Sequence, residues 1–136
     1  MTDPRYMLDT NAASHVIKGT WPAIRRRLAR VPMASVCVSA ITEAELLFGV
    51  ARRPEAPGLA TAVREFLLRL DVLAWDSAAA RAYAGLRSRL ERAGTPLGAL
   101  DTLIAAHAMA ADAVLVTGDK AFRKVRKLKL ADWSKG

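Results

Sequence analysis

Short apolar runs alternate along the chain with longer segments of helical pattern, and this alternation is the feature that most limits the fold. The runs are nearly continuously apolar, which is typical of strands that are covered on both faces. Four of them are predicted as strands, at residues 5–8, 35–39, 71–75 and 113–117. Strands of this kind that alternate with helices form a parallel sheet with helices on both sides. The sequence therefore predicts an α/β fold.

Helical patterns fill the intervals between these strands. The predicted helices span residues 24–30, 41–52, 59–69, 77–93 and 99–111, with residues 10 onward forming another after the first strand. The segment 41–52 is apolar almost all round, so we expect that helix to be largely buried. Residues 54–58 form a loop that is too short to separate two domains. We therefore expect a single domain over residues 1–136.

The charge balance favours a polyanionic partner. The chain has 21 Lys and Arg residues against 13 Asp and Glu residues, a formal net charge of +8. Such a balance suits a polyanion, although it can also serve only to keep a small protein soluble. The basic residues gather in two groups, which are Arg25, Arg26, Arg27 and Arg30, and Arg123, Lys124, Arg126, Lys127 and Lys129. Such groups usually form solvated surfaces, but they are also candidate contacts for the phosphates of a polyanionic partner.

Cysteine usage and hydropathy indicate a cytoplasmic protein. Cys37 is the single cysteine and lies in an apolar run, so no intrachain disulfide can form and a buried, inert thiol is expected. The N-terminus lacks the basic and apolar regions of a cleaved signal peptide. The most apolar long stretch, residues 97–116, is interrupted by charged residues and is too polar to span a lipid bilayer. We expect no membrane association.

Four acidic residues occupy positions where open parallel sheets gather functional groups. Asp9 ends the first predicted strand, and Asp119 lies two residues past the fourth. Asp101 falls in the first turn of the helix that precedes the fourth strand. Glu45 projects from the apolar helix 41–52 among apolar neighbours, where a carboxylate needs a partner. Glu43 lies two residues away on a different side of that helix and is expected to be structural.

Each acid has a simpler explanation when it is taken alone. Asp9 and Asp101 could cap helices, Glu45 could pair with Arg52 or another arginine, and Asp119 could close a turn. Carboxylates that converge at one sheet edge, however, repel one another unless a hard cation neutralises them. Mg²⁺ accepts oxygen ligands and keeps several waters, one of which can attack a phosphodiester. Together, the four acids predict a Mg²⁺ site, with Mn²⁺ as a substitute.

The chain also resembles a known family along its whole length. The similar segments are YMLDTN at 6–11, SAITEAEL at 39–46 with Gly49, GTPLGALDTLIAAHA at 94–108, VTGD at 116–119 with Phe122, and Asp132-Trp133. Each motif is short, but their order and spacing together resemble a PIN-domain toxin of the VapC type. The resemblance implies a central parallel sheet of four to five strands, flanked by helices on both faces.

The resemblance also implies an activity and partners. It implies a magnesium-dependent ribonuclease that is the toxin of a bacterial toxin–antitoxin pair, is neutralised by a small cognate antitoxin and forms a homodimer. The family's acidic site falls on Asp9, Glu45 and Asp101, with Thr10 and Asn11 as supporting polar groups. Many relatives have asparagine near position 119, so Asp119 could bind metal through water. Attack by water would leave a 5′-phosphate and a 3′-hydroxyl.

Other functions fit the sequence less well. A phosphatase with an aspartyl-phosphate intermediate generally has a second acid two residues after the first, but position 11 is Asn. His15, His107 and Cys37 lack the spacing of zinc ligands. Two alternatives stay open: a PIN-type nuclease that processes RNA without an antitoxin, and a basic RNA-binding module without catalysis. The three tryptophans, Trp21, Trp75 and Trp133, are expected to anchor the core or an interface.

Overall fold

A five-stranded parallel sheet forms the centre of the protein in the computed structural model, which describes residues 4–135. The strand order is β3-β2-β1-β4-β5, and every neighbouring pair is parallel. The strands are β1 (Tyr6–Leu8), β2 (Val36–Ser39), β3 (Asp71–Leu73), β4 (Val114–Val116) and β5 (Leu130–Ala131). Because β1 lies between β2 and β4, the strand order reverses between β1 and β4, and such folds place their sites at the carboxyl ends of the strands at this point.

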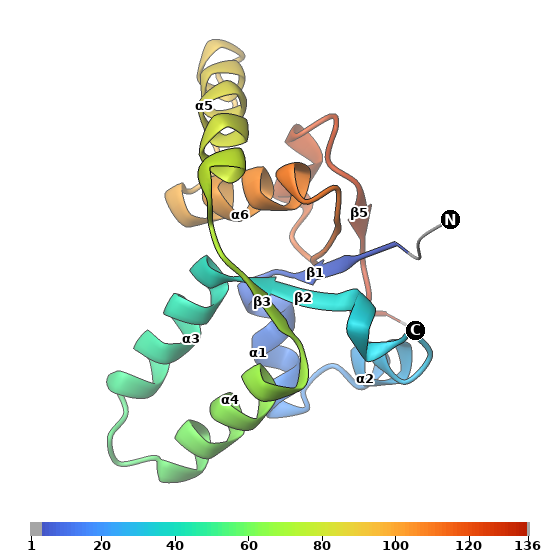
Figure 1. The fold of residues 1–136 in the computed structure, drawn as a ribbon, viewed down its shortest axis with the longest axis vertical. Coiled ribbons are helices and arrows are strands. Elements are labelled where there is room, and N and C mark those ends of the chain that lie inside the picture. Colours follow the sequence, from blue (N-terminus) through green and yellow to red (C-terminus); the bar gives the residue numbers. More distant parts are fainter. Residues whose placement is uncertain (1–3, 136) are drawn as a thin grey trace.

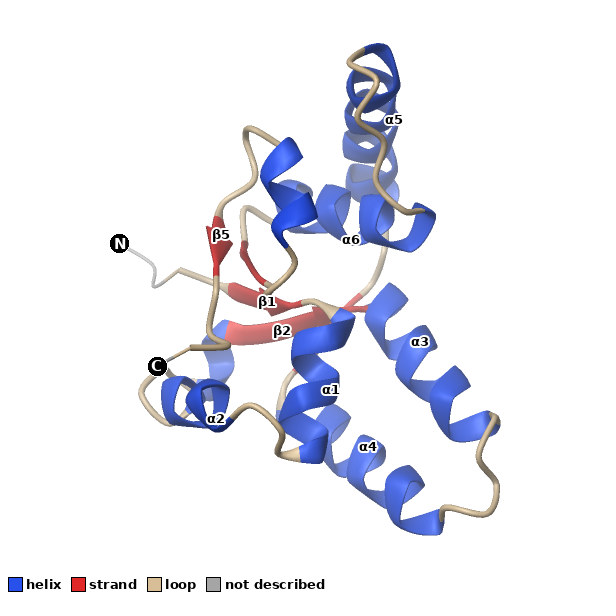
Figure 2. Cartoon of the chain, turned by 180° about the vertical axis from the view of Figure 1, so that it is seen from behind, coloured by secondary structure: helices blue, strands red, loops and turns tan. Residues whose placement is uncertain are grey.

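Helices cover both faces of this sheet (Figure 1, Figure 2). The helices are α1 (Thr10–Lys18), α2 (Pro22–Leu28), α3 (Ala40–Ala51), α4 (Pro57–Arg69), α5 (Ser77–Arg92) and α6 (Ala99–Ala110), with 3₁₀ turns η1 (Met33–Ser35) and η2 (Lys120–Lys124). Helices α5 and α6 lie on one side of the sheet, and α1, α2 and α4 lie on the other (Figure 1). The predicted α/β fold is confirmed.

The alternation of side chains along β1 explains why its residues are apolar throughout. Met7 packs with the core residues of α5 and α6, whereas Leu8 packs with those of α1, α2 and α4. Leu115 and Val116 on β4 divide between the two sides in the same way. Each strand therefore contributes to two hydrophobic layers, which is what a continuously apolar strand in a parallel sheet requires. Cys37 is free and buried on β2, as expected.

The fifth strand was not among the segments predicted as strands. β5 has only two residues and pairs Leu130 with Leu115 and Ala131 with Val116. A segment this short has no detectable alternation, and it follows a run of basic residues. Its pairing depends on the neighbouring β4 rather than on its own sequence.

The expectation that the helix at 41–52 is largely buried is wrong. Only Thr42 and Leu46 of α3 are buried, while Leu47 is 50% exposed and Phe48 is 61% exposed. The reason is that α3 and α4 form a pair that extends away from the sheet, so the outer side of α3 has nothing to pack against (Figure 1). Among the described residues, no helix combines the length and the hydropathy that crossing a membrane requires.

Candidate functional site

Asp9 lies at the carboxyl end of β1 and begins α1. Its Oδ1 atom accepts a hydrogen bond from the Ala12 amide at 2.7 Å, as an N-cap, and the residue is only 4% exposed. The Asp9 amide donates to the Val116 carbonyl at 3.0 Å, which ties this position to the end of β4. Asp9 is therefore both a helix cap and a buried carboxylate at the sheet edge.

Asp119 follows β4 and reaches the same edge of the sheet. Its Oδ1 atom accepts from the Ala121 amide at 2.9 Å and so caps η2, while its own amide donates to Thr117 Oγ1 at 3.0 Å. The Thr117 hydroxyl also acts on the Asp9 carboxylate, whose pKa it lowers. Thr117 therefore links Asp9 and Asp119. The sequence interpretation missed it, although a threonine that directly follows a buried strand was a usable signal.

Gly118, between Thr117 and Asp119, is needed for packing. A Cβ atom built there would lie 3.0 Å from the ring of Trp21, which is closer than nearly all real Cβ contacts. The indole of Trp21 therefore lies against the backbone next to Asp119.

Glu45 is held by α1 and not by an arginine. Thr10 Oγ1 donates to Glu45 Oε1 at 2.6 Å. Thr10 Oγ1 also lies 3.2 Å from Thr42 Oγ1. Glu45 and Arg52 form no ion pair within residues 4–135, so the alternative explanation by pairing is not supported. The supporting role predicted for Thr10 agrees with this contact. Asn11, in contrast, is exposed on α1.

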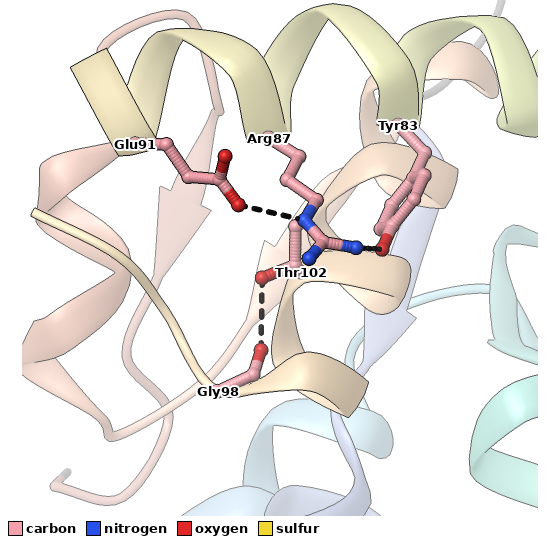
Figure 3. Close-up of polar contacts among 5 residues, drawn as sticks. All are labelled: Tyr83, Arg87, Glu91, Gly98 and Thr102. Atoms are coloured by element: carbon pink, nitrogen blue, oxygen red, sulfur yellow. Dashed lines mark hydrogen bonds and ion pairs between the residues drawn. The ribbon is translucent and has the colours of Figure 1, made fainter. Parts of the chain in front are cut away.

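Asp101 is in the first turn of α6 but does not cap it. The N-cap is Gly98, and no side chain caps that end of the helix. The turn is closed instead by Thr102, whose Oγ1 donates to the Gly98 carbonyl at 2.8 Å (Figure 3). The Asp101 carboxylate is thus left free by its own helix for another role.

The pKa shifts place the four carboxylates in one electrostatic cluster. Burial raises the pKa of Asp9 to about 6; hydrogen bonds from Thr117 and Ala12 oppose this rise, and the charges of Asp101 and Asp119 add to it. Burial also raises the pKa of Asp101, with further contributions from the charges of Asp119 and Glu45. Within the described part of the chain, none of the four acids forms an ion pair with Lys or Arg. The cluster therefore carries uncompensated negative charge.

The same residues fit a hard cation by chemistry, but they do not form a ready ligand shell. Carboxylate and hydroxyl oxygens are what Mg²⁺ and Mn²⁺ accept. Across residues 4–135, however, no three His, Cys, Asp or Glu side chains lie close enough to hold one ion together. The repulsion between carboxylates that raises the pKa values of Asp9 and Asp101 acts over a longer distance than a metal–ligand bond. The acids can therefore influence one another without being close enough to share an ion. Side chains of the cluster would have to rotate to close on an ion.

The other candidates have structural roles. His107 is buried, with Nδ1 2.7 Å from Ser39 Oγ, and burial lowers its pKa. His15 stacks on Trp21 with ring centroids 3.9 Å apart. Trp133 is buried in the core, and Trp75 Nε1 donates to the Leu103 carbonyl at 3.0 Å. The prediction that tryptophans anchor the core is confirmed for Trp133.

Comparison with known proteins identifies the family of the chain. The family model described as "PIN domain" matches residues 6–128. The "tRNA(fMet)-specific endonuclease VapC" of Shigella flexneri is 36% identical over 132 residues, covering 96% of this chain and 98% of that protein. The "Ribonuclease VapC2" of Rickettsia felis is 33% identical, with the same coverage of both chains.

Solved structures show the same similarity. A chain of the DNA-bound VapBC structure from Salmonella typhimurium superimposes with a TM-score of 0.90 and 33% identity, covering 96% of this chain and 99% of that chain. A chain of VapBC2 from Rickettsia felis, bound to a DNA fragment from their promoter, superimposes with a TM-score of 0.86 and 31% identity, covering 94% and 98%. The matches span nearly the full length of both partners in each comparison. The chain therefore belongs to the PIN-domain family, as a member of the VapC type.

Proposed function

We propose that the protein is an endoribonuclease that depends on Mg²⁺, or on Mn²⁺ in its place, and acts as the toxin of a type II toxin–antitoxin pair. The observation that carries the proposal is that four carboxylates, which form no ion pair with Lys or Arg within residues 4–135, interact electrostatically in a chain of the VapC type; two of them follow β1 and β4, and two lie on α3 and α6. The names of its relatives support an RNA-cleaving hydrolase. Complexes of such relatives, titled VapBC, support a cognate antitoxin.

In this proposal, Asp9, Glu45, Asp101 and Asp119 hold the cation. When bound, the ion would supply Lewis-acid stabilisation of charge on the phosphoryl oxygens and would acidify an attacking water. The protein's own part is to keep the carboxylates in place: the Ala12 amide and the Thr117 hydroxyl hold Asp9. The Thr10 hydroxyl orients Glu45. Hydrolysis by water would leave a 5′-phosphate and a 3′-hydroxyl on the RNA.

The proposed protein partners are a second copy of the chain and an antitoxin. The exposed side chains of Leu47, Phe48 and Leu68 on the α3–α4 pair are apolar surface that a second copy or an antitoxin would cover. We retain a homodimer as a prediction, to be tested by light scattering at micromolar concentration. A nuclease that processes RNA without an antitoxin would leave growth unchanged when it is expressed without any neighbouring gene.

A non-catalytic RNA-binding module is the second candidate, because Asp9 and Asp119 do cap α1 and η2. The deciding experiment incubates purified protein with total RNA, with Mg²⁺, with Mn²⁺ and with EDTA. The proposal expects cleavage only with a divalent ion and loss of cleavage in Asp101→Asn. The matched control is Asp76→Asn, which alters the exposed cap of α5, where Asp76 Oδ1 accepts from Ala79 at 3.1 Å. Binding without cleavage in all three buffers would refute the nuclease.

A further inference from the structure

A groove beside α5 has basic walls that the proposed catalytic site does not use. It has a volume of about 320 Å³ and lies between the end of α5 and the segment that follows η2. Its floor is apolar and consists of the buried side chains of Leu86, Leu90 and Val125. The remaining lining residues are Arg89, Ala93, Thr95, Lys124, Arg126 and Lys127. We call this cavity the α5 groove.

All charged side chains that line the α5 groove are positive. Arg89, Lys124, Arg126 and Lys127 are all exposed, and none of the lining residues is acidic. In the part of the chain that the structure describes, none of these four cations forms an ion pair. Glu91, on the same helix, is instead bound by Arg87, whose Nε donates to Glu91 Oε1 at 2.9 Å (Figure 3). The groove therefore presents four uncompensated positive charges to a ligand.

Two segments connect the α5 groove to the carboxylate cluster. Asp119 caps the N-terminus of η2, and Lys124 is the last residue of η2. At about 2 Å per residue of 3₁₀ helix, the five residues of η2 separate these two positions by about 10 Å. Lys124 Nζ donates to the Pro96 carbonyl at 3.4 Å, in the loop that leads through Gly98 to Asp101. The groove is therefore placed a few nucleotides from the site at which the proposed function cuts.

We propose that the α5 groove binds the phosphodiester backbone of the RNA substrate, away from the bond that is cut. The inference rests on the proposed function. Phosphates are the ligand that suits a line of unpaired Lys and Arg side chains, and such contacts position a nucleic acid without reading its sequence. The groove holds the RNA so that a phosphate further along the strand lies over the carboxylates. An acidic peptide is the alternative ligand for this groove, and polyglutamate binding distinguishes it from RNA.

The experiment compares a variant that lacks two positive charges of the α5 groove with a control variant that lacks two positive charges elsewhere on the surface. The test variant is Arg126→Gln with Lys127→Gln, because neither side chain makes a hydrogen bond or an ion pair with any residue from 4 to 135. Lys124 is left intact because it contacts Pro96. The matched control is Arg64→Gln with Arg69→Gln, two exposed cations on α4 across the sheet that belong to neither basic group of the sequence. The conservative variant Arg126→Lys keeps the charge.

The main readout is binding of a short fluorescent single-stranded RNA in EDTA, followed from about 50 to 200 mM salt. Two lost phosphate contacts should weaken binding roughly tenfold or more and lower the salt slope by about 1.4. The control and Arg126→Lys should bind like the wild type. In the cleavage assay with metal, the test variant should raise KM and leave kcat unchanged.

Three results would overturn the groove assignment. One is unchanged RNA binding in the test variant, and another is an equal loss in the control. The third is that polyglutamate, and not RNA, loses affinity in the test variant, which would make the groove a site for acidic peptides. Because binding is measured without cleavage, groove-dependent binding by a protein that never cuts would keep this inference and refute the nuclease.

Discussion

Replacing Asp9 by Asn should stabilise the metal-free protein at neutral pH. Asn is as good an N-cap as Asp, because its side-chain oxygen can accept the same hydrogen bond from the Ala12 amide. The substitution keeps the size of the side chain, which matters at a position that is 4% exposed. What it removes is the negative charge of a buried carboxylate beside Asp101 and Asp119.

The magnitude follows from the pKa. Folding raises the pKa of Asp9 from an ordinary 3.8 to about 6, chiefly through burial. Ionisation is therefore less favourable in the fold than in the unfolded chain, and the free energy of unfolding of the wild type decreases as the pH rises from about 4 to about 6. The full loss above that range is about 3 kcal/mol, which corresponds to a melting temperature lower by roughly 10 °C. The Asp9→Asn variant has no carboxyl group to ionise at this position, so it does not lose this part of the free energy of unfolding.

Thermal unfolding in EDTA between about pH 4 and pH 7 measures the effect. The wild type and Asp9→Asn should melt together near the lower limit, and the variant should melt higher near the upper one. Asp76→Asn is the control, since it changes an exposed cap outside the cluster and should show no such pH-dependent gain. If Asp9→Asn melts below the wild type at pH 7 in EDTA, Asp9 is a stabilising cap or pairing group, and the electrostatic account of the cluster is wrong.

Three further predictions concern the same cluster. Millimolar Mg²⁺ should stabilise the wild type by about 3 kcal/mol at a hundredfold excess over its Kd, and Asp101→Asn should lose most of that gain in a thermal shift assay. Thr10→Val should reduce cleavage about tenfold by releasing Glu45, whereas Thr10→Ser should retain it, as initial rates would show. Thr117→Val should raise the pKa of Asp9 further, because the Thr117 hydroxyl lowers it; the acidic limb of the pH–rate profile should move to higher pH, and an unmoved limb would contradict this.

The fold could be predicted from the sequence where one physical signal dominates. Residues 6–8 and 114–116 had to be strands because their side chains enter two hydrophobic layers at once. Gly94 directly follows the helix predicted at 77–93 and adopts a φ of +69° just past α5, a conformation that glycine accepts without strain. The apolar character of these strands and the glycine after α5 are local features of the sequence, so the strands and the helix end could be predicted from the sequence alone.

The exposure of α3 and the pairing of β5 could not be predicted in this way. An apolar helix is buried only if another element covers it, and Phe48 on α3 is left exposed because the α3–α4 pair extends beyond the sheet. Similarly, Leu130 belongs to a strand only because Leu115 lies beside it. Both properties depend on where distant segments lie, and no local pattern specifies that.

The candidate site combines these two kinds of information. That Asp9 and Asp119 share a sheet edge follows from parallel strands, whose carboxyl ends meet on the same side. Which hydroxyl holds each carboxylate depends on side-chain positions: Thr10 on α1 reaches Glu45 on α3, and Thr117 lies between two acids. The acids define which ion the site can accept, whereas Thr10 orients the Glu45 carboxylate and Thr117 lowers the pKa of Asp9. A change of a threonine should therefore alter the pH dependence and the rate, while a change of an acid should abolish the response to metal.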